Sequence, residues 1–171
     1  MATHFNISGE LTQELLAAGS NVRVNKISLT NTQKVSKCKV DLYIEKKLTG
    51  KFYLLKGVEL PIGTTLIYDD IKFSNATGEF GLYIKLTDGA TFTLTGSINP
   101  TGTNTTVPGS GTAFLSELSI GDEILVTGET RIVNAITGDT AATVSAAWGS
   151  DLADDTSPDC NPTALVDVII N

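Results

Sequence analysis

The sequence predicts an all-β protein, an antiparallel β-sandwich of jelly-roll type with a small acidic β-barrel-like insertion near the C-terminus. Three observations predict this class. Short alternations of apolar and polar residues, typical of strands with one buried face, recur along the 171 residues. Turns containing Gly or Asn separate these alternations at short intervals, as in sandwiches and barrels. The chain also holds 24 Thr and 16 Gly, a composition that favours strands and turns over helices.

The elements of the first half are expected as follows. Residues 8–19 carry one short helical signal, with Leu11, Leu15 and Leu16 at helical spacing, although an extended lead-in fits them equally well. The clearest strand is 38–44, where Cys, Val, Leu and Ile alternate with Lys, Asp and Tyr. Further strands are expected at 21–30 (with a bulge or bend), 52–58, 66–68, 71–73, 80–86 and 90–95.

The second half begins with a break in the pattern. Residues 97–110 are rich in turn formers and nearly uncharged, so we interpret them as a linker or an irregular strand. Next come a helical turn or a loop near 113–118, strands at 123–126, 130–136 and 140–145, a polar loop at 150–162, and a very apolar last strand at 164–170. That last strand either completes the small second unit or returns to the first sheet, and we favour the return. The sandwich domain is then 1–96 plus 163–171, and residues 97–162 are an inserted small β module with its linkers.

Charge differs sharply between the two parts. Residues 1–96 hold 11 basic and 9 acidic residues, whereas residues 97–171 hold Arg131 and 10 acidic residues. Six lysines of the first part either contact phosphate or alternate on the solvent-exposed face of strands. We favour the second interpretation, because no aromatic residues are interleaved with them. These lysines are Lys34, Lys37, Lys39, Lys46, Lys47 and Lys51. We therefore expect no nucleic-acid partner.

The sequence also argues against membrane and export signals. No apolar run approaches the ~20 residues of a membrane-spanning helix, so we expect no membrane association. The first residues show no basic region followed by an apolar stretch, so no signal peptide is expected. Cys38 and Cys160 are then expected to be free thiols, Cys38 as a packing residue.

Several candidates for chemistry have a simpler structural explanation. His4 is expected at the surface, and the neighbouring carboxylates of Asp69 and Asp70 should point apart. Four aspartates, Asp151, Asp154, Asp155 and Asp159, could cage a calcium ion, but their spacing fits no calcium loop. The stretch Gly109–Thr112 lacks the Lys of a phosphate-binding loop, and no His activates Ser110.

Trp148 is either the core of the small module or an exposed ring for stacking on sugars, and a module this small favours the core. Taken together, these residues predict no catalytic site, no cofactor-binding site and no metal site, and hence a protein that is not an enzyme.

Two stretches resemble virion structural proteins of tailed bacteriophages. The first combines a strand ending in Asn-Thr, a Val-x-Leu-Tyr strand, Tyr-Leu-Leu-Lys and a Pro-x-Gly-x-Thr-Leu turn, in residues 24–32, 40–44 and 52–66. Strands resembling Gly81–Leu86 and Ala164–Ile170 complete that series. The second resembles a module of phage tail, neck and capsid-associated proteins, with the pattern G-T-G-T-x-F, G-D-x-I, E-x-R-x-V and T-V, in residues 109–126, 129–136 and 139–144.

Within the second module, particular residues have expected structural roles. Gly121 and Gly128 should occupy tight turns with positive φ, and Arg131 should pair with Glu129 or Asp122. A small barrel core is expected from the module's apolar residues: Phe114, Ile124, Val126, Ile132, Val133, Ile136 and Val144.

The resemblance implies a non-enzymatic virion protein, assembled in the host cytoplasm. The expected roles are a capsid decoration or cement protein or a neck or tail accessory subunit; the alternative is a receptor- or glycan-binding module of a tail or fibre. Its expected partners are other virion proteins, and copies of the chain itself in a trimer or ring. Exposed aromatics on the sandwich, namely Phe52, Tyr53, Tyr68 and Tyr83, are candidates for such an interface.

The charge difference also predicts an orientation on the particle. Acidic modules crowded against a symmetric shell would repel one another, so we expect the sandwich to dock and the module to face solvent or a neighbouring subunit. A chain in which a short Gly-Ser linker joins Gly96 to Thr163 should then still fold and bind.

Overall fold

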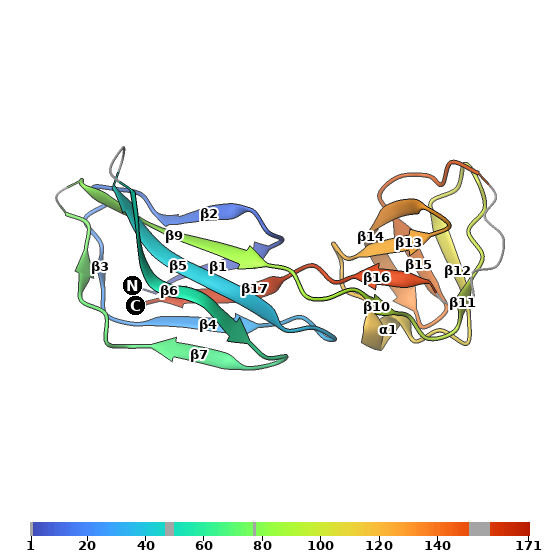
Figure 1. The fold of residues 1–171 in the computed structure, drawn as a ribbon, viewed down its shortest axis with the longest axis horizontal. Helices are drawn as coiled ribbons and strands as arrows, with labels where there is room; N and C mark the ends of the chain where they lie inside the picture. Colours follow the sequence, from blue (N-terminus) through green and yellow to red (C-terminus); the bar gives the residue numbers. More distant parts are fainter. Residues whose placement is uncertain (1, 47–49, 77, 151–157) are drawn as a thin grey trace. The chain divides into compact units, whose positions relative to one another are not determined.

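The computed structural model describes residues 2–46, 50–76, 78–150 and 158–171. Its regular structure is antiparallel β, apart from the short helix α1 (Phe114–Glu117), as the sequence predicts. The chain forms two compact units, each drawn in Figure 1. The first consists of residues 1–33, 37–88 and 164–171, and the second of residues 34–36 and 89–163.

The first unit contains two four-stranded antiparallel sheets (Figure 1). One has the order β1 (Thr3–Ser8), β17 (Leu165–Ile170), β4 (Ile27–Asn31) and β7 (Thr65–Tyr68). The other has the order β2 (Thr12–Leu16), β9 (Phe80–Thr87), β5 (Cys38–Lys46) and β6 (Gly50–Leu60). A two-stranded ribbon of β3 (Arg23–Val24) and β8 (Phe73–Ser74) completes the unit.

The core of the sandwich is built from the alternation that predicted its strands. Leu29 and Val168 come from one sheet and Leu42 and Ile84 from the other, and all four are fully buried in one cluster. Strand β17 pairs with both β1 and β4, so the last strand returns to the first sheet as expected. Only one face of β17 is buried, with Val166, Val168 and Ile170, whereas Ile169 on the other face is 43% exposed.

The helical signal in residues 8–19 does not produce a helix. The segment forms strand β2, which pairs with β9. A register shift between Glu14 and Leu16 buries the adjacent Leu15 and Leu16, whereas Leu11 is 79% exposed. The bulge therefore allows two adjacent residues of the strand to be buried, an arrangement that strict alternation does not give.

The second unit is one seven-stranded antiparallel sheet. Its order is β10 (Phe92–Thr93), β16 (Asp159–Asn161), β13 (Glu123–Val126), β14 (Glu129–Gly138), β15 (Ala141–Val144), β12 (Thr106–Ser110) and β11 (Ser97–Ile98). Within the described residues the sheet is open, with β10 and β11 at its edges. The sheet does not close into the expected barrel, and only its antiparallel strand pairing agrees with that expectation. Because β10 pairs with β16, residues 89–96 belong to this unit and not to the sandwich.

Trp148 lies in the core of the second unit, at 1% exposure, together with Phe114, Ile124 and Val144. One expected core residue is misplaced: Ile132 is 46% exposed. It lies opposite Glu123, whereas its neighbour Arg131 lies opposite the buried Ile124. The pleat therefore directs Ile132 away from the core.

The remaining core predictions for this unit agree with the structure. Val126 and Val133 are buried, and Ile136 packs against the same cluster while partly exposed. Gly121 and Gly128 have φ values of 98° and 83°, as expected of turns that exclude other residues.

Candidate functional site

Three tyrosines lie next to one another across the outer face of the sheet formed by β2, β9, β5 and β6. Tyr43 on β5 lies opposite Tyr83 on β9 and opposite Tyr53 on β6. Their strand neighbours Leu42 and Leu82 are buried in the sandwich core. Because side chains alternate along a strand, the tyrosines project from the opposite face of the sheet. We call Tyr83, Tyr43 and Tyr53 the tyrosine row.

The rings of the tyrosine row contact one another. The ring centroids of Tyr43 and Tyr83 are 5.7 Å apart with the planes 16° from parallel, and those of Tyr43 and Tyr53 are 5.5 Å apart and tilted by 53°. Both geometries are favourable for aromatic pairs, which contribute roughly 0.5–1.5 kcal/mol beyond their buried area. The row is therefore ordered by its own contacts.

One end of the row is fixed by a carboxylate. The Tyr83 hydroxyl donates a hydrogen bond of 2.8 Å to Oε1 of Glu14, which lies opposite Tyr83 on β2. This hydrogen bond, aided by desolvation, raises the pKa of Tyr83 to about 12. The phenol is therefore neutral at physiological pH and remains a hydrogen-bond donor.

Two lysines lie against the faces of the rings. Lys51 Nζ is 4.5 Å from the centroid of Tyr43, and Lys56 Nζ is 4.8 Å from the centroid of Tyr53. Cation–π contacts of this kind contribute about 0.5–1 kcal/mol at exposed sites. They also place positive charge at the border of the tyrosine row.

Exposure differs along the row. Tyr43 is 1% exposed, and within the described part of the chain its hydroxyl has no hydrogen-bond partner. Tyr53 is 43% exposed, so its ring remains accessible. A buried hydroxyl without a partner carries a desolvation cost. The row thus combines an accessible ring, that of Tyr53, with a buried hydroxyl, that of Tyr43, which interacts with the Lys51 ammonium and raises the pKa of Lys51.

Gly81 makes room for the row. A Cβ atom at Gly81 would lie 2.8 Å from Cε2 of Tyr83 and 3.2 Å from the carbonyl oxygen of Leu16. The Tyr83 ring therefore occupies the space above Gly81, and any side chain at that position would displace it.

The sequence identified only part of this surface. Among the four aromatics expected at an interface, Tyr53 and Tyr83 belong to the row, whereas Phe52 pairs with Phe80 at 5.9 Å and Tyr68 lies on β7 in the other sheet. Tyr43 was recognised as a residue of the polar face but not as the centre of a cluster. Only strand register, which no local pattern specifies, brings the three tyrosines together.

The expected non-catalytic residues lie as follows. His4, Asp69 and Asp70 are exposed. Asp151, Asp154 and Asp155 lie outside the described residues, and Asp159 accepts a hydrogen bond from Thr93 Oγ1 at 2.9 Å. Among the residues that the structure describes, no group of three or more His, Cys, Asp or Glu could hold a metal ion.

The stretch Gly109–Thr112 serves the fold of the second unit. Gly109 N–H donates to the carbonyl oxygen of Thr140 at 2.9 Å, and Thr112 Oγ1 donates to that of Asp139. Ser110 lies at the end of β12, opposite Ser97. These contacts connect the strands of the second unit.

Arg131 is a structural residue of the second unit. Its Nη2 donates to Glu129 Oε2 at 2.6 Å, its Nε donates to the carbonyl oxygen of Ala147 at 2.9 Å, and its guanidinium lies 5.4 Å from the Trp148 ring centroid. Of the two expected partners, Glu129 is the one observed. Because Trp148 is buried under this group, its ring is not available for stacking on a sugar.

Asp122, the other expected partner of Arg131, is a buried carboxylate with a different role. It accepts the backbone N–H of Ser119 at 2.7 Å and that of Thr163 at 2.8 Å. It thereby connects the turn at Gly121 to the segment that leads into β17. The sequence pattern Gly121-Asp122 gave no sign that the Asp122 carboxylate would accept these two backbone hydrogen bonds.

The lysines expected on the wet face are largely engaged within the protein. Lys37 pairs with Glu59 at 2.8 Å and Lys46 with Glu79 at 3.1 Å. Lys34 Nζ donates to the carbonyl oxygens of Leu115 and Leu118. Lys39 is exposed, and Lys47 lies outside the described residues.

Both cysteines are free thiols, as expected, and both are buried. Burial raises the pKa of Cys38 to about 11 and raises the pKa of Cys160 further above its usual range. The thiols are therefore protonated at neutral pH and poorly suited to nucleophilic chemistry.

Comparison with known proteins yields little. No family model and no curated protein matches the chain. A crystal structure of a serine protease of Aeromonas sobria aligns with 8% sequence identity and a TM-score of 0.28, covering 100% of this chain and 26% of the protease. At this TM-score the likeness bears on neither fold nor function. The helix in the described part of the chain is too short to cross a membrane.

Proposed function

We propose that this protein is a non-enzymatic structural subunit of a tailed-phage virion, a capsid decoration or cement protein or a neck or tail accessory protein. It binds the particle through the tyrosine row of its sandwich unit. The observation that carries the proposal is the row itself, in which Tyr53 is 43% exposed beside two stacked neighbours. Aromatic side chains of this kind are enriched at the centres of protein interfaces.

The charges of the two units support this assignment of roles. The first unit holds 10 basic and 10 acidic residues, and the second holds 2 basic and 9 acidic residues. A neutral unit can approach a crowded, repetitive shell without accumulating repulsion, whereas repeated copies of the acidic unit would repel one another. The second unit therefore faces solvent or a neighbouring subunit. Copies of the chain form a trimer or ring on the symmetric particle.

The location of the protein is tested by immunogold electron microscopy of tailed-phage particles purified from the bacterium that carries the gene. The proposal predicts regularly spaced label on the head, neck or tail tube. Label confined to fibre tips would instead favour the receptor- or glycan-binding alternative. Absence of label from particles, with the protein present in the same cells, would contradict a virion role.

The docking face is tested by co-sedimentation of purified protein with particles that lack it. Tyr53→Ser should weaken binding at least about tenfold, because an aromatic residue at an interface centre contributes roughly 2 kcal/mol or more. Ile67→Ser is the matched control, since Ile67 is 51% exposed on β7 of the other sheet. Equal binding by both variants would show that the row is not the docking face.

A further inference from the structure

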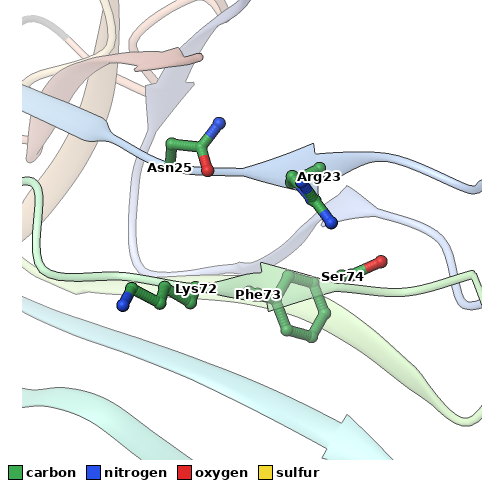
Figure 2. Close-up of a pocket in the computed structure, with 5 residues that line it drawn as sticks. All are labelled: Arg23, Asn25, Lys72, Phe73 and Ser74. Carbon is green, nitrogen blue, oxygen red and sulfur yellow. The ribbon is translucent and has the colours of Figure 1, made fainter.

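We propose that the ribbon of β3 and β8 forms a binding site for a phosphate group, either free phosphate or a phosphate monoester. The site is a hollow of ≈ 350 Å³ lined by Arg23, Asn25, Lys72, Phe73 and Ser74 (Figure 2). A volume of this size lies at the small end of the range for ligand pockets. The site uses residues outside the tyrosine row, so the inference is independent of the proposed function.

Strand register brings the polar lining residues together. Arg23 lies opposite Ser74 and Val24 lies opposite Phe73, in an antiparallel pair. Val24 is fully buried, so alternation directs Arg23 and Asn25, on either side of it, to the other face of the ribbon. Figure 2 shows the Arg23 guanidinium directed toward the strand that carries Phe73 and Ser74.

The lining offers hydrogen-bond donors and positive charge. Arg23 supplies a guanidinium fork, Lys72 an ammonium group, and Asn25 and Ser74 an amide and a hydroxyl. No acidic side chain is among the described residues that line the hollow, and neither Arg23 nor Lys72 forms an ion pair within the described part of the chain. A site with two cations and several donors matches an anion with several acceptor oxygens.

The backbone next to the hollow is already engaged. Asn25 N–H and Lys26 N–H both donate to the carbonyl oxygen of Asn171, at 2.8 and 3.0 Å. These two donors are therefore not available to a ligand, which must be recognised by side chains. Two cations suit the double charge of phosphate better than the single charge of a carboxylate. Phe73 lies opposite the buried Val24 and packs against the core, so its ring is on the other face of the ribbon.

The site is tested by titrating the full chain with inorganic phosphate, glycerol 3-phosphate and acetate while recording amide NMR shifts. We expect saturating shifts at residues 22–26 and 72–75 with both phosphates, at a Kd on the order of 1 mM, and about tenfold weaker binding of acetate. Tighter binding of glycerol 3-phosphate would identify an ester as the ligand, and equal binding would identify free phosphate. Acetate binding as tight as phosphate would overturn the proposal.

Substitutions of the two cationic residues test whether each contributes to phosphate binding. Arg23→Gln and Lys72→Gln should each weaken phosphate binding about tenfold, because each removes a charge-assisted hydrogen bond. Lys85→Gln is the matched control, since Lys85 is an exposed lysine of β9 that does not line the hollow. Unchanged spectra away from the ribbon would show that the variants are folded. Binding unaffected by both substitutions, or no saturation up to roughly 20 mM phosphate, would refute the site.

Discussion

The two units are both antiparallel β structure, but they are stabilised in different ways. In the first unit two sheets enclose a core of 18 buried residues, largely aliphatic, among them Leu29, Leu42 and Ile84. In the second unit a smaller core surrounds Trp148 and Phe114, and turns are fixed by buried or partly buried carboxylates such as Asp122. Buried side chains also fix turns in the first unit, where Asn31 and Asn75 bond to the backbone, so the units differ chiefly in the size of the core and in its dependence on one large ring.

This difference has a consequence for substitutions. Cores rich in aliphatic residues tolerate a change at one position by repacking, whereas a small core around one large ring cannot fill the space that the ring leaves. We expect a single substitution of a large core residue in the second unit to unfold that unit while the first unit remains folded.

The largest effect is expected for Trp148→Ala. Removing a fully buried Trp costs roughly 3–5 kcal/mol, a large share of the stability of a small unit. Amide NMR spectra should lose the dispersed signals of residues 89–150 and retain those of the sandwich. Ile27→Val in the first unit, a milder change in a larger core, should leave both sets of signals in place. Loss of all dispersed signals in Trp148→Ala would show that the two units do not fold separately.

A smaller effect is expected for Asp122→Ala. The buried backbone N–H of Ser119 loses its acceptor, at a cost of about 1–3 kcal/mol, whereas the N–H of Thr163 is only partly buried and can bond to water instead. Asp139→Ala serves as the control, because Asp139 accepts the Leu115 N–H at an exposed position. Urea unfolding monitored by Trp148 fluorescence measures both variants. Equal losses of stability would mean that burial of Asp122 is unimportant.

The smallest effect is a pH dependence that both units share through their buried thiols. The pKa of Cys38 is raised from 9.0 to about 11 in the folded protein, so the unfolded chain ionises first as pH rises. The free energy of unfolding should therefore be unaffected by this thiol below pH 9 and should fall between pH 9 and 11. In Cys38→Ala that part of the decrease should be absent. An unchanged pH profile in the variant would contradict the assignment to Cys38.

The sequence predicts features that depend on neighbours along the chain better than features that depend on pairing. Alternation identified β5 and β9, and composition identified Trp148 as core. The segment 8–19 was ambiguous, because a bulge in β2 buries both Leu15 and Leu16. Likewise, Ile132 was expected in the core because it is apolar, but its register with Glu123 places it outside.

The candidate sites show the same limit. Tyr53 and Tyr83 were recognised as interface candidates individually, but their cluster with Tyr43 exists only because β6, β5 and β9 pair in one register. Similarly, Arg23 and Lys72 are 49 positions apart in the sequence and line the same hollow only because β3 pairs with β8. No pattern within either segment specifies that pairing.

The most direct test of the account is whether the first unit folds without the second. The N–H of Ala164 donates to Oδ1 of Asp88 at 2.6 Å, so the two ends left by removing residues 89–163 are adjacent and a linker of two glycines can join them. We predict that this shortened chain gives dispersed amide NMR signals, unfolds cooperatively in urea and still co-sediments with particles. A chain that remains unfolded would contradict the claim that the sandwich is self-sufficient, and a folded chain that fails to bind would place docking in the second unit.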